Sequence, residues 1–263
     1  MIFAAGLGTR LKPITDTLPK ALVPVCDKPL IELTCSKLMS AGINEAVVNI
    51  HHFADKIEDW AKHQEWIHVG QEGTGEGKFR IMFSDERAQL LETGGAVLHA
   101  RAFLEGCGHF LIHNVDILSN ADLDWLQTQV KPDALATLMV SKRETTRFLL
   151  FDPETMRLVG WHNTDSGAHH LTDESIAIED CLALGFSGIH ILSDKVLGLM
   201  EEYARSRDLP VEDPAGVKFS IMNFYLWAAS KYPIYGAIAE DLNFLDVGKL
   251  DALAPAEEFV KNM

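Results

Sequence analysis

Short apolar runs alternate with segments of helical spacing through the first half of the chain. The expected strands cover residues 1–5, 46–50, 79–83, 110–112 and 134–140, and the expected helices cover residues 30–41, 53–61, 94–104 and 122–130. Strands that alternate with amphipathic helices are typical of βαβ units, in which helices cover both faces of a sheet. We therefore predict an α/β fold with a Rossmann-like, doubly wound sheet that is mixed but mainly parallel. Ligands should bind beyond the carboxyl ends of its strands.

The second half of the chain has a more mixed pattern. Its expected elements are two apolar runs that flank Asp152-Pro153 (148–151 and 157–161), a polar loop (163–174), a strand (182–192), a helix that Ser193 caps and that ends near Arg205, and a last helix (219–229). Apolar runs on either side of an Asp-Pro turn are typical of a hairpin. This half therefore predicts a small β-rich excursion from the main sheet.

Length and composition fit one large α/β domain or two lobes that share a core, and they exclude several classes of partner. The chain has 263 residues, 47% of them apolar, and a formal net charge of −15. Nucleic acids and anionic membranes need a basic face, so neither is expected as the main partner. No apolar run approaches the roughly 18 residues of a membrane helix. The four cysteines form no Cys-x-x-Cys pair, which favours reduced thiols in a cytoplasmic protein.

The first twenty residues contain a candidate phosphate site. An apolar run, residues 1–5, leads into Gly6-Leu7-Gly8, where glycines permit positive φ and let backbone N–H groups approach a phosphate closely. Arg10 and Lys20 follow and supply the positive charge that a triphosphate needs. The alternative is a plain strand and turn with cations on its surface.

The spacing of this segment excludes two common nucleotide motifs. A dinucleotide fingerprint needs a third glycine where Leu11 stands, and a P-loop needs Gly-Lys-Ser/Thr where Gly8 is followed by Thr9-Arg10. The glycine-rich residues 70–77 also lack a P-loop register and are expected to form an exposed connection.

The pattern Gly-x-Gly-Thr-Arg-Leu-x-Pro-x-Thr, followed by Pro-Lys, resembles the signature of the sugar-phosphate nucleotidyltransferases. Members of this family make nucleotide-diphosphate sugars from a nucleoside triphosphate and a sugar 1-phosphate. The resemblance implies that the nucleotide is bound by Ala5, Gly6, Gly8, Thr9, Arg10 and Lys20.

Two aspartates are candidate metal ligands. Asp116 follows an apolar strand within Asn114-Val115-Asp116, and Asp246 follows a second apolar run in Asp246-Val247-Gly248. Two carboxylates from distant strands suit Mg²⁺, which takes hard oxygen ligands and often keeps only one or two carboxylates besides substrate phosphates. In the resembled family these two motifs jointly hold the metal. Each aspartate alone could instead cap a helix or form a turn.

The segment Glu92-Thr93-Gly94-Gly95 precedes an expected helix. Its glycines would let backbone groups approach a flat ring, although a loop with Thr93 as helix N-cap is the simpler interpretation. In the family this segment contacts the nucleobase. The version in this chain resembles that of the N-acetylmuramate 1-phosphate uridylyltransferases, while related versions occur in guanylyltransferases, so the choice of base stays open.

Phe186-Ser187-Gly188-Ile189 resembles the strand that lines the family's sugar pocket, which implies sugar contacts from Asn114, Ser187 and Gly188. A core strand with a glycine bulge is the alternative. Many family members also carry a Glu-Lys-Pro whose lysine holds the sugar phosphate. This chain has no such triplet between Lys142 and Phe186, so that cation is unassigned, and Lys249 is a candidate.

The resemblance implies a glycosyltransferase-A-like fold, with one domain over residues 1–263 divided into a nucleotide-binding half (1–117) and a sugar-binding half (118–263). It also implies in-line attack by the sugar phosphate on the α-phosphorus of the triphosphate, with Arg10, Lys20, Asp116 and Asp246 as catalytic residues and Mg²⁺ as cofactor. The main expectation is UTP with N-acetylmuramate 1-phosphate or a related hexose phosphate. The alternatives are a GTP-dependent mannose or heptose transferase and a catalytically silent nucleotide-sugar sensor, and the oligomeric state stays open.

Overall fold

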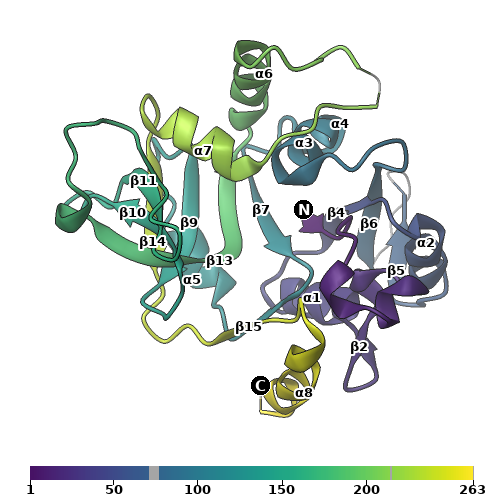
Figure 1. The fold of residues 1–263 in the computed structure, drawn as a ribbon. Helices are drawn as coiled ribbons and strands as arrows, with labels where there is room; N and C mark the ends of the chain where they lie inside the picture. Colours follow the sequence, from purple (N-terminus) through teal and green to yellow (C-terminus); the bar gives the residue numbers. More distant parts are fainter. Residues whose placement is uncertain (71–76, 214, 263) are drawn as a thin grey trace.

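One large mixed sheet organises the computed structural model, which describes residues 1–70, 77–213 and 215–262 (Figure 1). Within these residues the sheet has eleven strands, in the order β12-β11-β10-β13-β7-β1-β4-β6-β5, with β9 joined to β13 and β14 joined to β9. Its strands are β1 (Ile2–Phe3), β4 (Glu45–Ile50), β5 (Ile67–Val69), β6 (Phe79–Asp85), β7 (His109–Asn114), β9 (Ala136–Ser141), β10 (Arg147–Phe151), β11 (Leu158–Asn163), β12 (His169–Leu171), β13 (Leu182–Ser193) and β14 (Ile234–Ile238).

The direction of the strands divides this sheet into two parts. From β5 to β7 all neighbours are parallel, as expected for βαβ units. From β7 onward β13 runs antiparallel to β7, β9 and β10, and β10, β11 and β12 form an antiparallel extension. The predicted β-rich excursion is this extension.

Helices cover both faces of the sheet. They are α1 (Leu30–Ser40), α2 (Ala54–Lys62), α3 (Glu92–His99), α4 (Arg101–Leu104), α5 (Leu123–Thr128), α6 (Val196–Ser206), α7 (Ile221–Ala229) and α8 (Leu253–Lys261). One core cluster packs α1, α2, α5 and α8 against the sheet, and a second packs α3, α4, α6 and α7 against the other face. In β4 the side chain of Val48 enters the first core and that of Val47 the second, because successive strand residues point to opposite faces. The prediction of a doubly wound α/β fold is confirmed.

Two short antiparallel ribbons lie outside the main sheet. One joins β2 (Pro24–Val25) to β3 (Lys28–Pro29), and the other joins β8 (Ile117–Ser119) to β15 (Phe244–Asp246). The second ribbon places residues 244–246 beside residues 117–119, which follow β7.

The first expected strand is shorter than its apolar run. It ends at Phe3 because the Ala4 N–H donates at 2.7 Å to the side-chain oxygen of Asn49 in β4 and not to a backbone carbonyl of that strand. Ala5 is buried beyond it, and Thr9 begins an exposed 3-10 turn, Thr9–Leu11.

Two expectations for the second half are wrong. The polar stretch 163–174 is expected to be only a loop, but it contains β12, whose backbone pairs with β11 although two of its three residues are histidines. Ser193 does not cap a helix. It is the last residue of β13, opposite His109, and α6 begins only at Val196. Both differences arise from backbone pairing with another strand, β11 for β12 and β7 for Ser193, which the local pattern does not contain.

The glycine-rich connection predicted at residues 70–77 lies almost entirely outside the described residues. No helix in the described part of the chain is long and apolar enough to cross a membrane.

Candidate active site

Two acidic residues from distant parts of the chain lie together where the parallel strands end. Asp116 follows the end of β7, and Asp246 is the last residue of β15. The ribbon of β8 and β15 sets Asp246 opposite Ile117, and the Val247 N–H donates to the Asp116 carbonyl at 2.8 Å. Backbone pairing in this ribbon therefore brings the two carboxylates side by side.

Two cations complete this acidic pair. Lys20 Nζ forms an ion pair with Asp116 Oδ2, and the two side chains are only 12% and 16% exposed. Arg10 Nη2 lies 4.0 Å from Asp246 Oδ2 in a more exposed position. A Cβ on Gly248 would lie 2.5 Å from both Arg10 Nη2 and Asp246 Oδ1, so a larger residue would displace this pair. The structure thus brings together all four residues predicted to be catalytic.

The electrostatics of this cluster favour a bound cation. Burial raises the pKa of the Asp246 carboxyl and the charge of Asp116 raises it further, while Lys20 and Arg10 act in the opposite direction. Two adjacent carboxylates repel each other, and a divalent cation relieves that repulsion. Within the described residues no group of three or more His, Cys, Asp or Glu side chains is placed to hold a metal. A metal at this edge would therefore depend on these two carboxylates and on substrate oxygens.

The glycine loop folds back onto the segment that carries Lys20. Gly8 has a φ of +62°, and a Cβ there would lie 2.9 Å from Thr15 Cγ2 and 3.1 Å from Lys20 Cβ. Thr15 Oγ1 donates to the Gly8 carbonyl at 2.8 Å and holds the turn. Gly6 does not adopt a left-handed conformation, contrary to the expectation, and has no atom near its missing side chain. Its exposed backbone is open to a ligand.

Close packing against residues 217–219 explains why positions 94 and 95 are glycines. Their N–H groups both donate to the Phe219 carbonyl, at 2.9 and 3.1 Å, and a Cβ on either would collide with the segment Val217–Phe219. Thr93 is not a helix cap, because α3 already begins at Glu92 and the Thr93 hydroxyl accepts from the Ile221 N–H at 3.0 Å. The contact of this segment with a nucleobase stays a prediction.

A buried glutamate, which was not singled out from the sequence, connects the glycine loop after β1 to the segment that precedes α3. Glu86 is 1% exposed. Its carboxylate accepts from Asn49 Nδ2 at 2.8 Å and from the Leu91 N–H at 3.1 Å, and Asn49 in turn accepts from Ala4. Burial raises the pKa of Glu86, while these hydrogen bonds lower it. Glu86 follows an apolar strand at the same sheet edge as Asp116, which is the signal that would have identified it.

The predicted sugar residues lie beside the acidic pair. Gly188 has a φ of +79° at a bulge in β13, and a Cβ there would lie 2.7 Å from Asn114 Nδ2. The Ser187 hydroxyl is buried and engaged, since it donates to the Met139 carbonyl at 2.8 Å and accepts from the Ile189 N–H at 3.2 Å. Asn114 and Gly188 are therefore adjacent, whereas Ser187 points into the fold.

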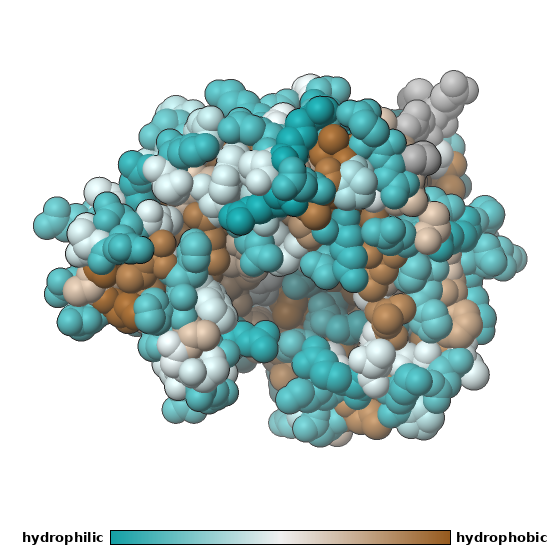
Figure 2. Space-filling model, turned by 45° about the horizontal axis from the view of Figure 1, so that its top comes forward, coloured by the Kyte–Doolittle hydropathy of each residue, from teal (hydrophilic) through white to brown (hydrophobic). Residues whose placement is uncertain are grey.

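A hollow near the centre of one face separates the side that carries β10–β12 from the side that carries α2 and β5 (Figure 2). Lys249, the sequence candidate for the sugar phosphate, is exposed just after Gly248 and makes no ion pair with any described residue. Its role stays a prediction.

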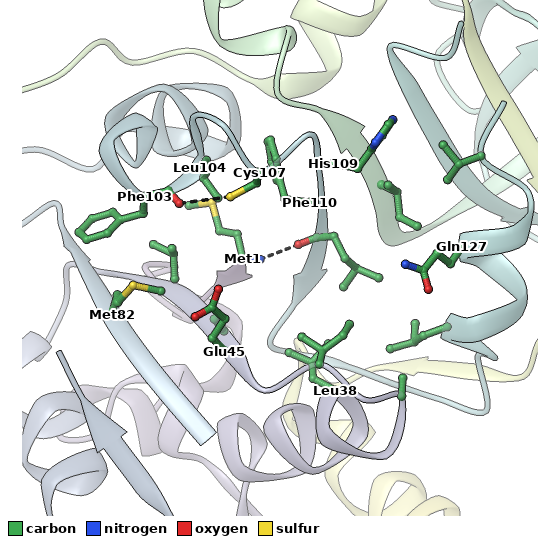
Figure 3. A pocket seen from close by; sticks show the side chains of 18 of the residues that line it. Met1, Leu38, Glu45, Met82, Phe103, Leu104, Cys107, His109, Phe110 and Gln127 are labelled. Atoms are coloured by element: carbon green, nitrogen blue, oxygen red, sulfur yellow. Dashed lines mark hydrogen bonds between the residues drawn. The ribbon is translucent and has the colours of Figure 1, made fainter. Parts of the chain in front are cut away.

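A second cavity lies at the opposite edge of the sheet. It has a volume of about 610 Å³, and Met1, Glu45 and His109, at or near the amino ends of β1, β4 and β7, line it (Figure 3). Because these positions are at the far ends of the strands from Asp116, this cavity is separate from the candidate site.

Comparisons with known proteins agree with this geometry. Residues 1–148 match the family model of the nucleotidyl transferases. An N-acetylmuramate alpha-1-phosphate uridylyltransferase of Caulobacter vibrioides is 35% identical over 201 residues, covering 74% of this chain and 75% of the relative. A UTP–glucose-1-phosphate uridylyltransferase of Synechocystis sp. is 28% identical over 267 residues, covering 95% of this chain and 60% of the relative.

Solved structures match the fold over nearly the whole chain. A UDP-glucose pyrophosphorylase from Acinetobacter baumanii superposes with a TM-score of 0.69 and 18% identity over 97% of this chain and 90% of the other. The fold is thus glycosyltransferase-A-like, as the sequence resemblance implies. The signature in the first twenty residues, the cluster at the sheet edge and the matches to known proteins show together that the chain belongs to the nucleotidyl transferase family.

Proposed function

We propose that this protein is a uridylyltransferase that joins UTP to N-acetylmuramate 1-phosphate or a closely related hexose phosphate and releases pyrophosphate. The observation that carries the proposal is the cluster of Arg10, Lys20, Asp116 and Asp246 beside the open glycine loop. The Caulobacter vibrioides relative supports the choice of UTP and of this sugar.

The reaction needs positioning and charge more than covalent chemistry. An oxygen of the sugar 1-phosphate attacks the α-phosphorus of UTP, the bond to the β-phosphate oxygen breaks, and pyrophosphate leaves. Lys20, held in place at Asp116, is positioned to contact the phosphates at the reacting centre. Arg10, which is more exposed, would stabilise the leaving pyrophosphate. Both cations reduce the repulsion between two anionic substrates.

Asp116 and Asp246 fit a Mg²⁺ ion. They are adjacent, they come from elements that backbone pairing fixes, and the raised pKa of Asp246 reflects burial and the repulsion that a divalent cation would relieve. When bound, Mg²⁺ would neutralise charge on the reacting phosphates.

The remaining predicted residues divide between the two substrates. We assign nucleotide binding to the half 1–117 and sugar binding to the half 118–263, with Asn114 at the border between them. The proposed nucleotide contacts are Ala5, Gly6, Gly8, Thr9, Glu92, Thr93, Gly94 and Gly95. The proposed sugar contacts are Asn114 and Gly188, and Ser187, whose hydroxyl is bonded within the fold, supports the strand that carries Gly188.

The test is release of pyrophosphate in the presence of Mg²⁺, measured for four nucleoside triphosphates against the 1-phosphates of N-acetylmuramate, N-acetylglucosamine, glucose and mannose. The proposal predicts release with UTP and N-acetylmuramate 1-phosphate. Release with GTP and mannose 1-phosphate would contradict the substrates and indicate a guanylyltransferase. Nucleotide binding without release for any pair would contradict the activity and favour a nucleotide-sugar sensor.

A further inference from the structure

A cavity with two arginines in its wall lies in the part of the molecule that carries β10, β11 and α7. It has a volume of about 470 Å³ and lies between the start of β10, Trp161 of β11 and the first turn of α7. This volume is within the range of small-molecule sites. Arg143 and Arg147 line it together with apolar side chains, among them Phe148 and Leu226.

Arg143 is held in place from three sides although it is exposed. Its Nη2 donates to the Phe186 carbonyl at 3.2 Å, its guanidinium carbon lies 4.8 Å from the centre of the Phe244 ring, and its side chain crosses Gly185. A Cβ on Gly185 would lie 2.5 Å from Arg143 Nε, so the glycine leaves the space that the arginine occupies.

The position of Arg143 links the cavity to the catalytic cluster. Phe244 begins the strand that ends in Asp246. Burial of the guanidinium lowers the pKa of Arg143, and the charge of Asp246 acts in the opposite direction. No carboxylate among the described residues lies within ion-pair distance of Arg143. This is therefore a fixed cation, near the two carboxylates, that lacks an anionic partner.

Arg147 gives the same cavity a second unpaired cation. It is the first residue of β10, and its guanidinium makes no hydrogen bond or ion pair with any residue that the structure describes. The chain has a net charge of −15, so carboxylates to pair with it are abundant elsewhere. Two unpaired guanidinium groups in one apolar-walled cavity fit a ligand with two separate anionic groups, because guanidinium binds phosphate and carboxylate in bidentate geometry.

We propose that Arg143 binds the phosphate of the sugar 1-phosphate and that Arg147 binds a carboxylate on the sugar, so that the cavity selects an acidic sugar phosphate. This inference rests on the proposed function and deepens it. It assigns to Arg143 the cation that the missing Glu-Lys-Pro left open. It also explains the apolar wall around Arg147, which suits a carboxylate carried on a short carbon chain.

The test compares two substrates that differ only in that carboxylate. N-acetylmuramate 1-phosphate is N-acetylglucosamine 1-phosphate with a lactyl ether, and both are assayed at saturating UTP. Arg147→Gln should lower kcat/KM for the acidic substrate about 10- to 100-fold, the effect of losing one charged hydrogen-bonded partner, and leave the neutral substrate unchanged. Arg143→Gln should raise KM for both sugar phosphates by a similar factor without raising KM for UTP. Arg157→Gln, which removes an exposed arginine outside the cavity, should change neither.

Equal loss for both substrates in Arg147→Gln, or no loss for either, would overturn the role of Arg147. A rise in KM for UTP in place of the sugar phosphate would overturn the role of Arg143. Turnover assays of the wild-type protein distinguish failure of this inference from failure of the proposed function. Turnover of neutral sugar phosphates alone would refute selection by Arg147 while the transferase activity stands. No turnover of any sugar phosphate would refute the proposed function, and binding of N-acetylmuramate 1-phosphate, measured by titration calorimetry on wild type and Arg147→Gln, would then still decide the inference.

Discussion

The proposed catalytic cluster contains one firmly held pair of residues and one loosely held pair. Lys20 and Asp116 are mostly buried and paired, so they are ordered before a substrate arrives. Arg10 and Asp246 are about half exposed and only loosely paired, at 4.0 Å. A loosely held cation can turn toward a phosphate at little cost, because an exposed ion pair contributes at most about 1 kcal/mol.

Arg10→Ala should therefore affect turnover and leave stability unchanged. We expect kcat/KM to fall roughly 10²- to 10³-fold, as for loss of one group that stabilises charge in the transition state. Steady-state kinetics and thermal unfolding measure the two effects. Lys12→Ala is the matched control, since Lys12 is an exposed cation of the same loop that pairs with Asp16 outside the cluster. Wild-type turnover of Arg10→Ala would contradict the role of Arg10.

Glu86 joins two loops through hydrogen bonds: the glycine loop after β1, through Asn49, and the segment before α3, through Leu91. Glu86→Gln should raise KM for the nucleotide and lower the free energy of unfolding by about 1–3 kcal/mol, because one of its two acceptor oxygens becomes an amide that faces the donors Asn49 and Leu91. Urea unfolding and kinetics with varied UTP test this. The exposed Glu105, paired on the surface with Arg101, supplies the control Glu105→Gln. A variant at position 86 with unchanged stability would refute the network as a support.

At the scale of elements, the site is assembled by pairings between strands that are far apart in the sequence. The ribbon of β8 and β15 aligns Asp246 with Asp116, and the bulge in β13 brings Gly188 against Asn114. These contacts fix the positions of Asn114 and Gly188, in the proposed sugar site, relative to the proposed metal ligands Asp116 and Asp246. A change in one element should therefore affect the substrate that this element contacts.

Gly188→Ala tests that dependence. Its positive φ and its contact with Asn114 both oppose a Cβ, so we expect a loss of about 1–3 kcal/mol in the free energy of unfolding and a raised KM for the sugar phosphate, with KM for UTP unchanged. Gly198→Ala is a matched control in α6, where a Cβ meets nothing within 4 Å and no positive φ occurs. That variant should be more stable by about 0.5–1 kcal/mol. If both glycines respond alike, backbone strain at the bulge is not the cause.

At the scale of the whole molecule, the sheet that separates the two cores carries buried histidines in β7 and β13. His190 is 1% exposed, is stacked on Phe186 at 5.2 Å, and has neither ring nitrogen bonded to any described residue. Burial lowers the pKa of His190 to about 3 and that of His113 to about 4. Both histidines are neutral in the folded protein at neutral pH.

This arrangement predicts that acid destabilises the fold. An unfolded histidine has a pKa near 6.5, so between about pH 6.5 and pH 4 the unfolded state binds more protons than the folded state. The free energy of unfolding should therefore fall as the pH is lowered through this range, by up to about 1.4 kcal/mol per pH unit for each histidine. Urea unfolding at pH 7 and pH 5 measures it.

His190→Phe should make this pH dependence shallower, because phenylalanine keeps the ring contacts and cannot be protonated. His169→Phe, at an exposed position of β12, should leave it as in the wild type. An unchanged slope in His190→Phe would assign the acid sensitivity to other groups.

The sequence by itself determined most of the order of strands and helices in the first half of the chain and the segments that carry the cluster. Apolar runs fixed which segments enter the sheet, and the rule that ligands bind at the carboxyl ends of strands identified Asp116 and Asp246 before any contact was known. The glycine loop and its cations were recognisable because their features are local: glycines and cations at short spacing.

Only the tertiary structure decided which groups meet. β12 forms because β11 offers it a backbone ladder, and Ser193 stays in a strand because His109 lies opposite it. Glu86 and Arg143 have no distinctive neighbours in the sequence, and their importance comes from partners tens of residues away. Burial and hydrogen-bond geometry depend on contacts between distant segments, which no local pattern of apolar and polar residues specifies.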